Sequence, residues 1–343
     1  MSSKENELTG VDNKALEFYC KNYVPLLSYI QTMQNDGSYI VINLLTNEEK
    51  ETITIDDGPD ERICRYCGKK KPDVKFKKIA HLFPESLGNK CFFSNNECDT
   101  CNEHLFSIYE NDLCAFLTPY LSTNEIFGKG KPKEVKTNGI PRYNKTREYK
   151  SNDKTFRVQS INKVITVQSE GESKLVYDKE NKILSIPFDI GKHTPYNVYK
   201  AVLKMALAIL PKSLYDKLKI MQRLLKEDLE PIGIEKAIIT CYPGMNLYDL
   251  TIMCYQRQND VVNYPTYIFF IAFGNVSLQI GLFADSDFSR FNNQRPIEFV
   301  AIPTPFDKLG NEYKHCELID LSSKERVNAK MMMSFHAELK ENE

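Results

Sequence analysis

Four cysteines in two closely spaced pairs bracket a segment that contains a histidine. The pairs are Cys64-x2-Cys67 and Cys98-x2-Cys101, and His81 lies between them. This spacing is typical of a single zinc ion held by four thiolates in a tetrahedron, with no coordination position left open. We therefore predict a structural Zn²⁺ site, and unrelated buried thiols are the alternative.

Two side chains near these cysteines have the chemistry of a catalytic site. A neutral imidazole at His81 can take a proton from an attacking water, as a general base does. Asn102 directly follows the last cysteine and offers an amide oxygen. The alternatives are a loop histidine that hydrogen-bonds backbone groups and a helix-start asparagine that satisfies free amides.

Three motifs follow one another within about sixty residues: Cys64-Arg-Tyr-Cys67, Ala80-His81-Leu-Phe-Pro84-Glu85-Ser-Leu-Gly88-Asn89 and Glu97-Cys98-Asp99-Thr-Cys101-Asn102. In the type and order of these motifs, residues 60–120 resemble the HNH endonuclease family. The resemblance implies a ββα-metal fold that hydrolyses phosphodiester bonds.

The resemblance also implies a role for individual side chains. His81 matches the histidine that activates water, and Asn102 matches a helix residue that binds one divalent ion, Mg²⁺ or Mn²⁺. The ion would stabilise charge on the phosphate and on the departing oxygen. Asn95 best matches, by its spacing to Asn102, the asparagine that orients the histidine loop, with Asn96 and Asn89 as alternatives.

Two positions depart from the family pattern. Ala80 stands where many members carry an acidic metal ligand, and Phe106 stands where some carry a further helix ligand. A hard cation prefers several oxygen ligands, so one amide is too few. We predict that Glu85, in the loop after the histidine, supplies the missing carboxylate. Other carboxylates close in sequence are alternatives: Asp99, Glu103 and Glu110. A further alternative is that His81 itself contacts the ion, which water and substrate phosphate then complete.

Positive charge gathers near these motifs, although the net charge of the chain is only -1. Residues 61–90 carry nine Lys/Arg and three Asp/Glu, and residues 129–150 carry eight and two. Such stretches are suited to neutralising phosphates, and two solvated surface loops are the alternative reading. Phosphate contacts are predicted for Lys69, Lys70, Lys71, Lys75, Lys77, Lys78, Lys129, Lys131 and Lys133.

The elements that must position these residues follow from the apolar pattern, which predicts an α+β fold. A helix is expected at 13–34, and a strand ending near His81, a second strand at 90–93 and a helix at 99–117 are expected in the cysteine-bracketed segment. Strands at 154–188 and 235–304, the last of them at 297–304, should form an antiparallel sheet with a helical pair at 195–228. The predicted parts are an N-terminal helix with short strands (1–57), the zinc-stabilised ββα-metal unit (58–120), a basic connector (121–150) and an α+β domain that selects substrate or regulates activity (151–343).

Composition narrows the function classes. No run of eighteen apolar residues occurs and the N-terminus lacks a signal-peptide core, so we expect a cytoplasmic protein without membrane spans. Ten cysteines fit a zinc site plus reduced thiols.

The leading hypothesis is a metal-dependent HNH endonuclease acting on DNA, with RNA not excluded, and the resemblance suggests genome defence or restriction. The alternative is a non-catalytic zinc-knuckle module that binds nucleic acid. An activating partner protein, a sensed ligand and a homodimer all stay open.

Overall fold

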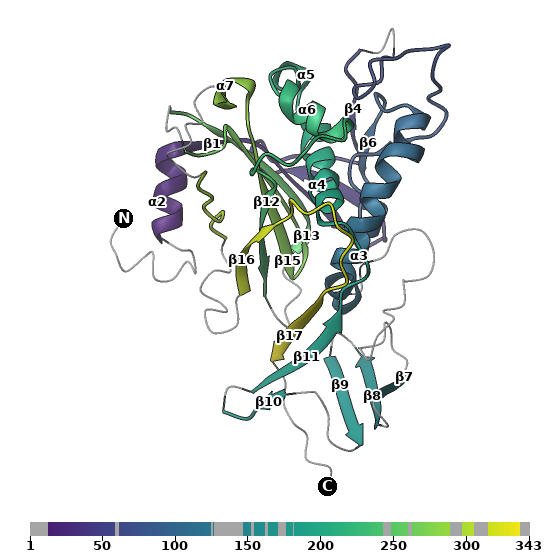
Figure 1. The fold of residues 1–343 in the computed structure, drawn as a ribbon, viewed down its shortest axis with the longest axis vertical. Helices are drawn as coiled ribbons and strands as arrows, with labels where there is room; N and C mark the ends of the chain where they lie inside the picture. Colours follow the sequence, from purple (N-terminus) through teal and green to yellow (C-terminus); the bar gives the residue numbers. More distant parts are fainter. Residues whose placement is uncertain are drawn as a thin grey trace.

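The framework of the molecule is an eight-stranded antiparallel sheet with helices packed against it, and two of the three smaller sheets lie below it in the view of Figure 1. The computed structural model describes residues 13–58, 62–124, 126, 147–151, 154–161, 164–170, 176–180, 182–242, 248–259, 263–288, 297–304 and 315–336. Helices and antiparallel strands are mixed along these ranges, so the predicted α+β fold class is confirmed.

The central sheet takes its strands from distant parts of the chain. In spatial order they are β16 (His315–Asp320), β12 (Lys236–Cys241), β15 (Val276–Leu282), β14 (Tyr267–Gly274), β13 (Tyr248–Arg257), β1 (Tyr23–Met33), β2 (Tyr39–Asn43) and β3 (Glu48–Lys50). Neighbouring strands pair antiparallel throughout. The N-terminal strands therefore complete a sheet whose other members follow the cysteine-bracketed segment.

The helix predicted over 13–34 is wrong beyond residue 22. Helix α2 spans Asn13–Asn22, and the chain then continues as strand β1. Pro25 has no N–H to donate, and it stands where the pairing of β1 with β13 shifts between Pro25 and Leu27. The aromatic and branched side chains after it pair with β13 and β2, so long-range pairing overrides the helical spacing.

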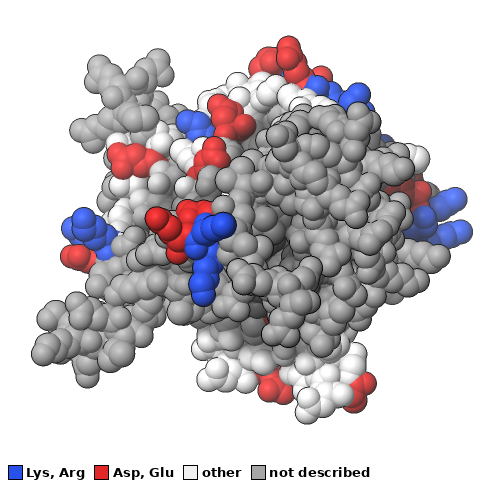
Figure 2. Space-filling view, turned by 90° about the horizontal axis from the view of Figure 1, so that it is seen from below, with Lys and Arg blue, Asp and Glu red and all other residues white. Residues whose placement is uncertain are grey.

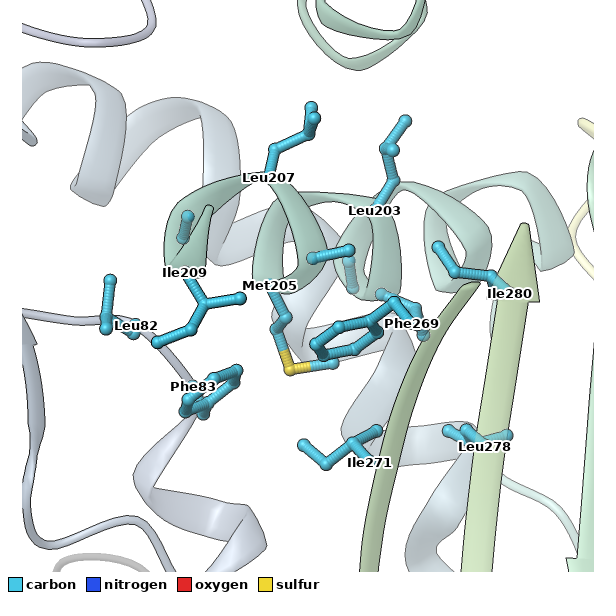
Figure 3. Packing of buried hydrophobic residues seen from close by; sticks show 14 of the residues in the cluster. Leu82, Phe83, Leu203, Met205, Leu207, Ile209, Phe269, Ile271, Leu278 and Ile280 are labelled. Atoms are coloured by element: carbon cyan, nitrogen blue, oxygen red, sulfur yellow. The ribbon is translucent and has the colours of Figure 1, made fainter. Parts of the chain in front are cut away.

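Both faces of the central sheet are covered. All residues of β14 are buried, and their side chains alternate between the two faces. Ile268 and Phe270 pack on one side with Tyr19 of α2. Phe269 and Ile271 point to the other side, toward helix α4 (Pro195–Ile209) (Figure 3).

Helix α4 is the centre of the core. Every residue in it except Asn197 is buried, as expected for a helix that is apolar nearly all round. Leu82 and Phe83 of the cysteine-bracketed segment lie beside Ile209 (Figure 3). One continuous cluster of buried apolar side chains thus joins that segment, α4 and the sheet.

The helical pair is found with a break in its second member. After α4 come α5 (Lys212–Tyr215) and α6 (Lys219–Lys226) instead of one helix. The Asp285 carboxylate, in the short helix α7 (Asp285–Phe288), accepts hydrogen bonds from the backbone N–H groups of Lys219 and Ile220, at 3.2 and 2.9 Å. This capping interaction starts a new helix at that point.

Three small sheets complete the described elements. One contains β4 (Ile53–Ile55), β6 (Phe92–Ser94) and β5 (Ala80–His81), in that order. A second contains β7 (Arg147–Ser151), β8 (Lys154–Ile161) and β9 (Val164–Glu170). The third contains β10 (Val176–Asp178), β11 (Ile183–Asp189) and β17 (Lys330–His336). The sequence did not predict β7, β16 or β17.

Residues 297–304 are not a strand, contrary to the prediction. They lie on the sheet all the same, because the buried side chain of Gln279 takes the place of a strand partner. Its amide donates to the Val300 carbonyl at 2.7 Å and accepts from the Ile302 N–H at 2.8 Å.

Among the helices that the structure describes, none is long and apolar enough to span a bilayer.

Candidate active site and metal centre

The four cysteines converge on one point. Their Sγ atoms all lie within 4.8 Å of one another, and the Cys64–Cys101 and Cys67–Cys98 sulfurs are each 3.8 Å apart. Four sulfurs arranged tetrahedrally around zinc, each at about 2.3 Å, stand about 3.8 Å from one another. The cluster is therefore compatible with a structural zinc, as the sequence predicts.

The ionisation of these thiols also suits a dication. Hydrogen bonding with the Cys101 thiol lowers the pKa of Cys64 to about 4, whereas burial raises the pKa of Cys98 to about 11. Zinc binds cysteine as thiolate, and several thiolates at this distance repel one another. A bound Zn²⁺ would supply the positive charge that stabilises all four in the ionised form.

Each cysteine pair lies on a tight turn that aims its sulfurs. In the first, Gly68 adopts a φ of +70°, which favours glycine, and its N–H donates to the Cys64 carbonyl at 2.8 Å. In the second, the N–H of Asn102 donates to the Cys98 carbonyl at 3.0 Å, where the helical turn η2 (Cys101–Phe106) begins. Helix α3 (Ser107–Thr123) continues from η2.

His81 ends the two-residue strand β5, which pairs antiparallel with β6. The predicted strand is short because the N–H groups of Lys77 and Lys78 bind the Asp99 carboxylate, each at 3.0 Å, instead of a neighbouring strand. The imidazole packs on Phe93 with ring centres 5.1 Å apart, and 23% of the His81 side chain is exposed. The histidine is thus held by the sheet and remains accessible.

Glu85 lies beside this histidine. It begins the single turn η1 (Glu85–Leu87), and its Oε1 is 3.7 Å from His81 Nε2. The structure therefore brings together the predicted general base and the predicted replacement acid. Glu103 and Glu110, two alternatives for that acid, instead form ion pairs with Lys78 and Lys204.

Asn89 is the asparagine that holds the histidine loop. Its fully buried amide donates to the carbonyls of Phe83 and Phe92 at 2.7 and 3.0 Å, and accepts from the N–H groups of Cys91 and Phe92. Its Nδ2 also lies 3.4 Å from Nδ1 of His81. Because both amide hydrogens already serve carbonyls, Asn89 fixes the loop backbone more than the tautomer of the ring.

The two asparagines nearest Asn102 in sequence hold other segments. Asn95 donates to the Asp56 carboxylate at 2.9 Å, and Asn96 accepts from the Asp57 N–H at 2.7 Å. The geometry therefore gives the loop-orienting position to Asn89 rather than Asn95. Spacing along the chain could not show this, because the loop turns back at Gly88 and brings Asn89 under the histidine strand.

A histidine on a hairpin-like strand pair, followed by a helix that begins in a cysteine knuckle, is a ββα arrangement. Residues 64–111 match the family model described as HNH endonuclease. We call this segment the HNH unit. No curated protein and no solved structure matches the chain. An HNH endonuclease unit implies nucleic acid as the substrate class.

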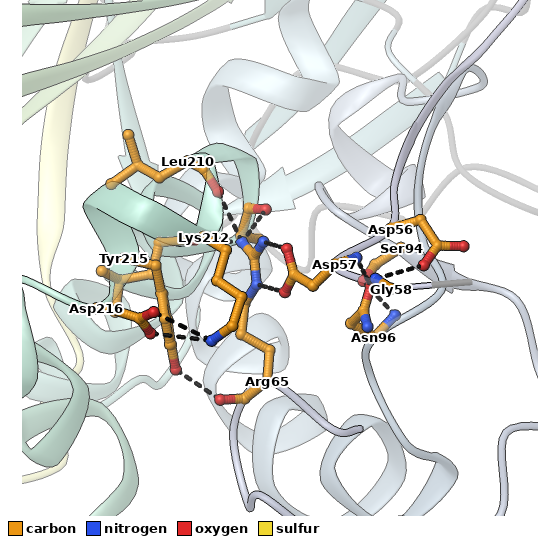
Figure 4. Close-up of polar contacts among 12 residues, drawn as sticks. Asp56, Asp57, Gly58, Arg65, Ser94, Asn96, Leu210, Lys212, Tyr215 and Asp216 are labelled. Carbon is orange, nitrogen blue, oxygen red and sulfur yellow. Dashed lines mark hydrogen bonds and ion pairs between the residues drawn. The ribbon is translucent and has the colours of Figure 1, made fainter. Parts of the chain in front are cut away.

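The HNH unit is bound firmly to the C-terminal end of α4. Arg65, between the first two cysteines, donates through one guanidinium nitrogen to the Leu207, Ala208 and Leu210 carbonyls, at 3.1, 2.9 and 2.9 Å (Figure 4). It also forms a bidentate ion pair with Asp57. A cation at a helix C-terminus satisfies free carbonyls and favours the helix dipole.

The six predicted lysines of the HNH unit all point to solvent: Lys69, Lys70, Lys71, Lys75, Lys77 and Lys78. Val74 and Phe76 are buried among them and hold the segment against the core. Lys129, Lys131 and Lys133 lie outside the described residues. On the face in Figure 2, by contrast, described cations and carboxylates lie side by side without gathering by sign. The exposed lysines of residues 69–78 are therefore available for the phosphate contacts predicted from the sequence.

We expect nucleic-acid affinity to depend steeply on salt through these lysines. The measurement is a titration of a short DNA duplex at several salt concentrations. A plot of log affinity against log salt concentration should have a slope of about -0.9 for each phosphate that the protein contacts. The variant Lys69→Gln/Lys75→Gln/Lys77→Gln should reduce that slope by about one per lysine lost. Its control is Lys217→Gln/Lys219→Gln/Lys226→Gln, which removes the same charge from exposed lysines around α6. Equal slopes for both variants would contradict the assignment.

Proposed function

We propose that this protein is a metal-dependent endonuclease that hydrolyses phosphodiester bonds of DNA, with His81 as the general base. One observation carries the proposal: the imidazole of His81 and the carboxylate of Glu85 lie 3.7 Å apart inside the HNH unit, and each side chain is between a fifth and a quarter exposed, at 23% and 22%. A zinc knuckle that only bound nucleic acid would need neither group.

His81 would accept the proton of the attacking water. A neutral imidazole must lie within hydrogen-bond reach of that water and keep a fixed ring orientation. The pairing of β5 with β6 and the Phe93 ring would restrain the imidazole, and the Asn89 amide would hold the loop backbone that carries it. The exposed part of the side chain leaves room for the phosphate.

Glu85 and Asn102 would hold the catalytic ion, which would stabilise negative charge on the phosphate and the leaving oxygen. A carboxylate and an amide are hard oxygen ligands suited to Mg²⁺ or Mn²⁺. Within the described ranges, the four cysteines are the sole group of three or more His, Cys, Asp or Glu side chains placed to bind a metal. The catalytic ion would therefore keep several ligands from water and substrate phosphate.

Glu85→Gln tests the assignment of the acid. We expect cleavage to fall by about 10- to 100-fold at low Mg²⁺, with partial recovery at high Mn²⁺, because the variant loses affinity for the metal. The measurement is the initial cleavage rate against metal concentration. Glu103→Gln is the control, because that carboxylate pairs with Lys78 on the same unit. Near-normal activity of Glu85→Gln would assign the acid elsewhere.

A non-catalytic nucleic-acid-binding module is the second candidate, and one observation favours it. Ala80 is 1% exposed, so the residue before the histidine provides no ligand and little room for one. Incubating the protein with plasmid DNA, single-stranded DNA and RNA in Mg²⁺, Mn²⁺ or Ni²⁺ separates the two candidates. Cleavage in any mixture supports the nuclease, and binding without cleavage in all of them supports the module.

The wider setting is part of the proposal. We favour a role in genome defence or restriction within the cytoplasm, with residues 151–343 selecting the substrate or regulating cleavage. An activating partner protein, a sensed ligand or homodimer formation would each provide such control. Repeating the cleavage assay with candidate activators, and measuring the mass of the protein in solution, distinguishes these routes.

A further inference from the structure

A buried lysine outside the HNH unit contacts the backbone of the proposed catalytic histidine. Lys204 lies in the middle of α4, is 1% exposed, and its Nζ donates to the carbonyl oxygen of His81 at 3.0 Å. We infer that Lys204 is a positioning residue for His81, so that the active site is completed by α4. This inference rests on the proposed nuclease function.

The charge of Lys204 is balanced by carboxylates of the HNH segment. Its Nζ lies 3.2 Å from Oε1 of Glu110 and 3.4 Å from Oε2 of Glu97, and the ammonium stands over the Phe106 ring at 5.4 Å. An ammonium is costly to bury unless partners surround it closely. An apolar side chain would fill the same place in this core helix without that cost, so the lysine points to a need for its donor.

The carbonyl of His81 has a reason to need that donor. The Leu82 N–H donates to the Phe92 carbonyl at 3.1 Å. Polar groups alternate in direction along an antiparallel pair, so the His81 carbonyl points away from β6. A backbone carbonyl at this depth requires a partner, and the ammonium of Lys204 provides a charge-assisted one.

Helix α4, which carries Lys204, is held in position by contacts at both of its ends. At the N-terminal end, the Asp112 carboxylate accepts from the Thr194 N–H at 3.2 Å and from the Asn197 amide at 2.8 Å. At the C-terminal end, Arg65 binds the last carbonyls. Both charges have the sign that favours the helix dipole, so α4 is clamped against the segment that carries His81.

Clamping matters because β5 is short. A two-residue strand has little pairing of its own to fix the peptide from which the imidazole projects. A general base must stand within a few tenths of an ångström of its working position, and a shift of about 1 Å can cost roughly 100-fold in rate. The hydrogen bond from Lys204 restrains that peptide on the side that faces away from β6.

Another lysine on the same helix provides a matched control. Lys200 lies one turn before Lys204, is also buried, and its Nζ also donates to a backbone carbonyl, that of Glu227, at 2.9 Å. Lys200→Met and Lys204→Met therefore remove the same groups from the same helix. Only the second removes the contact with His81.

The test uses the full chain with three measurements for each variant: kcat and KM for cleavage, zinc content, and the imidazole signals of His81 in protein labelled at histidine. The His81 signals are assigned by their loss in His81→Ala. Lys204→Met is made alone and together with Glu97→Gln, because the fully buried Glu97 carboxylate would otherwise keep an unpaired charge, whereas the Glu110 side chain is 27% exposed and can be solvated. Lys204→Arg keeps a charged donor.

Both Lys204→Met variants should lower kcat by about 10- to 100-fold, with KM and zinc content nearly unchanged, and should move the His81 signals. Lys204→Arg should recover part of kcat, and Lys200→Met should stay within about twofold of wild type even if it melts earlier. Equal loss of kcat in the Lys200 and Lys204 variants, or unmoved His81 signals, would overturn the inference. A further outcome is that the wild type cleaves no nucleic acid while the His81 signals move in Lys204→Met and not in Lys200→Met. In that case the nuclease proposal fails and the positioning contact stands.

Discussion

His81→Ala should reduce cleavage by about 100- to 10,000-fold, the usual contribution of a general base. The base acts on water in the transition state and adds little to ground-state affinity, so nucleic-acid binding and zinc content should stay close to wild type. Initial rates on plasmid DNA, a binding titration and metal analysis check the three parts of this result.

A second histidine of the HNH unit provides the control. His104 is exposed on η2, and His104→Ala should keep nearly full activity. A His81→Ala rate within about tenfold of wild type would be too small a loss for a general base, and would remove His81 from that role.

Cys98→Ser should release zinc and unfold the HNH unit. The apparent binding free energy of a structural zinc is about 10–16 kcal/mol in small zinc-binding peptides, which equals or exceeds the stability of a typical domain. Because Leu82 and Phe83 pack on α4 and Arg65 caps it, part of this loss should reach α4. Metal analysis and hydrogen exchange over 62–124 and 195–209 measure both effects.

Cys91→Ser separates loss of zinc from the cost of a buried hydroxyl. Cys91 is 2% exposed in the same unit but lies outside the cluster of four sulfurs. It should keep full zinc content and lose only about 1–3 kcal/mol of stability. If Cys98→Ser also kept its zinc and its protection from exchange, the four-cysteine site would not be the structural centre of this unit.

The parts of the site that follow from local spacing were predictable from the sequence. In each cysteine pair the second cysteine follows three residues after the first, and Glu85 contacts His81 from four residues further along the chain. The contact of Asn89 with the histidine loop was harder to predict. It depends on how the loop folds back at Gly88, which a count of residues between motifs does not show.

Contacts between segments that are far apart in the sequence could not be predicted, because no spacing or motif in the sequence indicates them. Lys204 is 123 positions from His81, and Arg65 is 142 or more from the α4 carbonyls that it binds. In the sequence, Lys204 looks like a polar interruption of an apolar helix. The switch from helix to strand at Tyr23 is hidden for the same reason, since its cause is β13.

The order of strands in the central sheet has a consequence for biosynthesis. β1 lies between β2 and β13, so the ribosome delivers β1, the whole HNH unit and α4 before the chain that completes the sheet has been made. Closing a pairing across more than two hundred residues is a late and slow event in folding. His81 and the four-cysteine cluster thus leave the ribosome long before Lys204, and a nascent chain that ends between them carries His81 without the hydrogen bond from Lys204. The sheet on which α4 packs is completed only after β12 to β16 have been made, so the contact between Lys204 and His81 gains its full support late in translation.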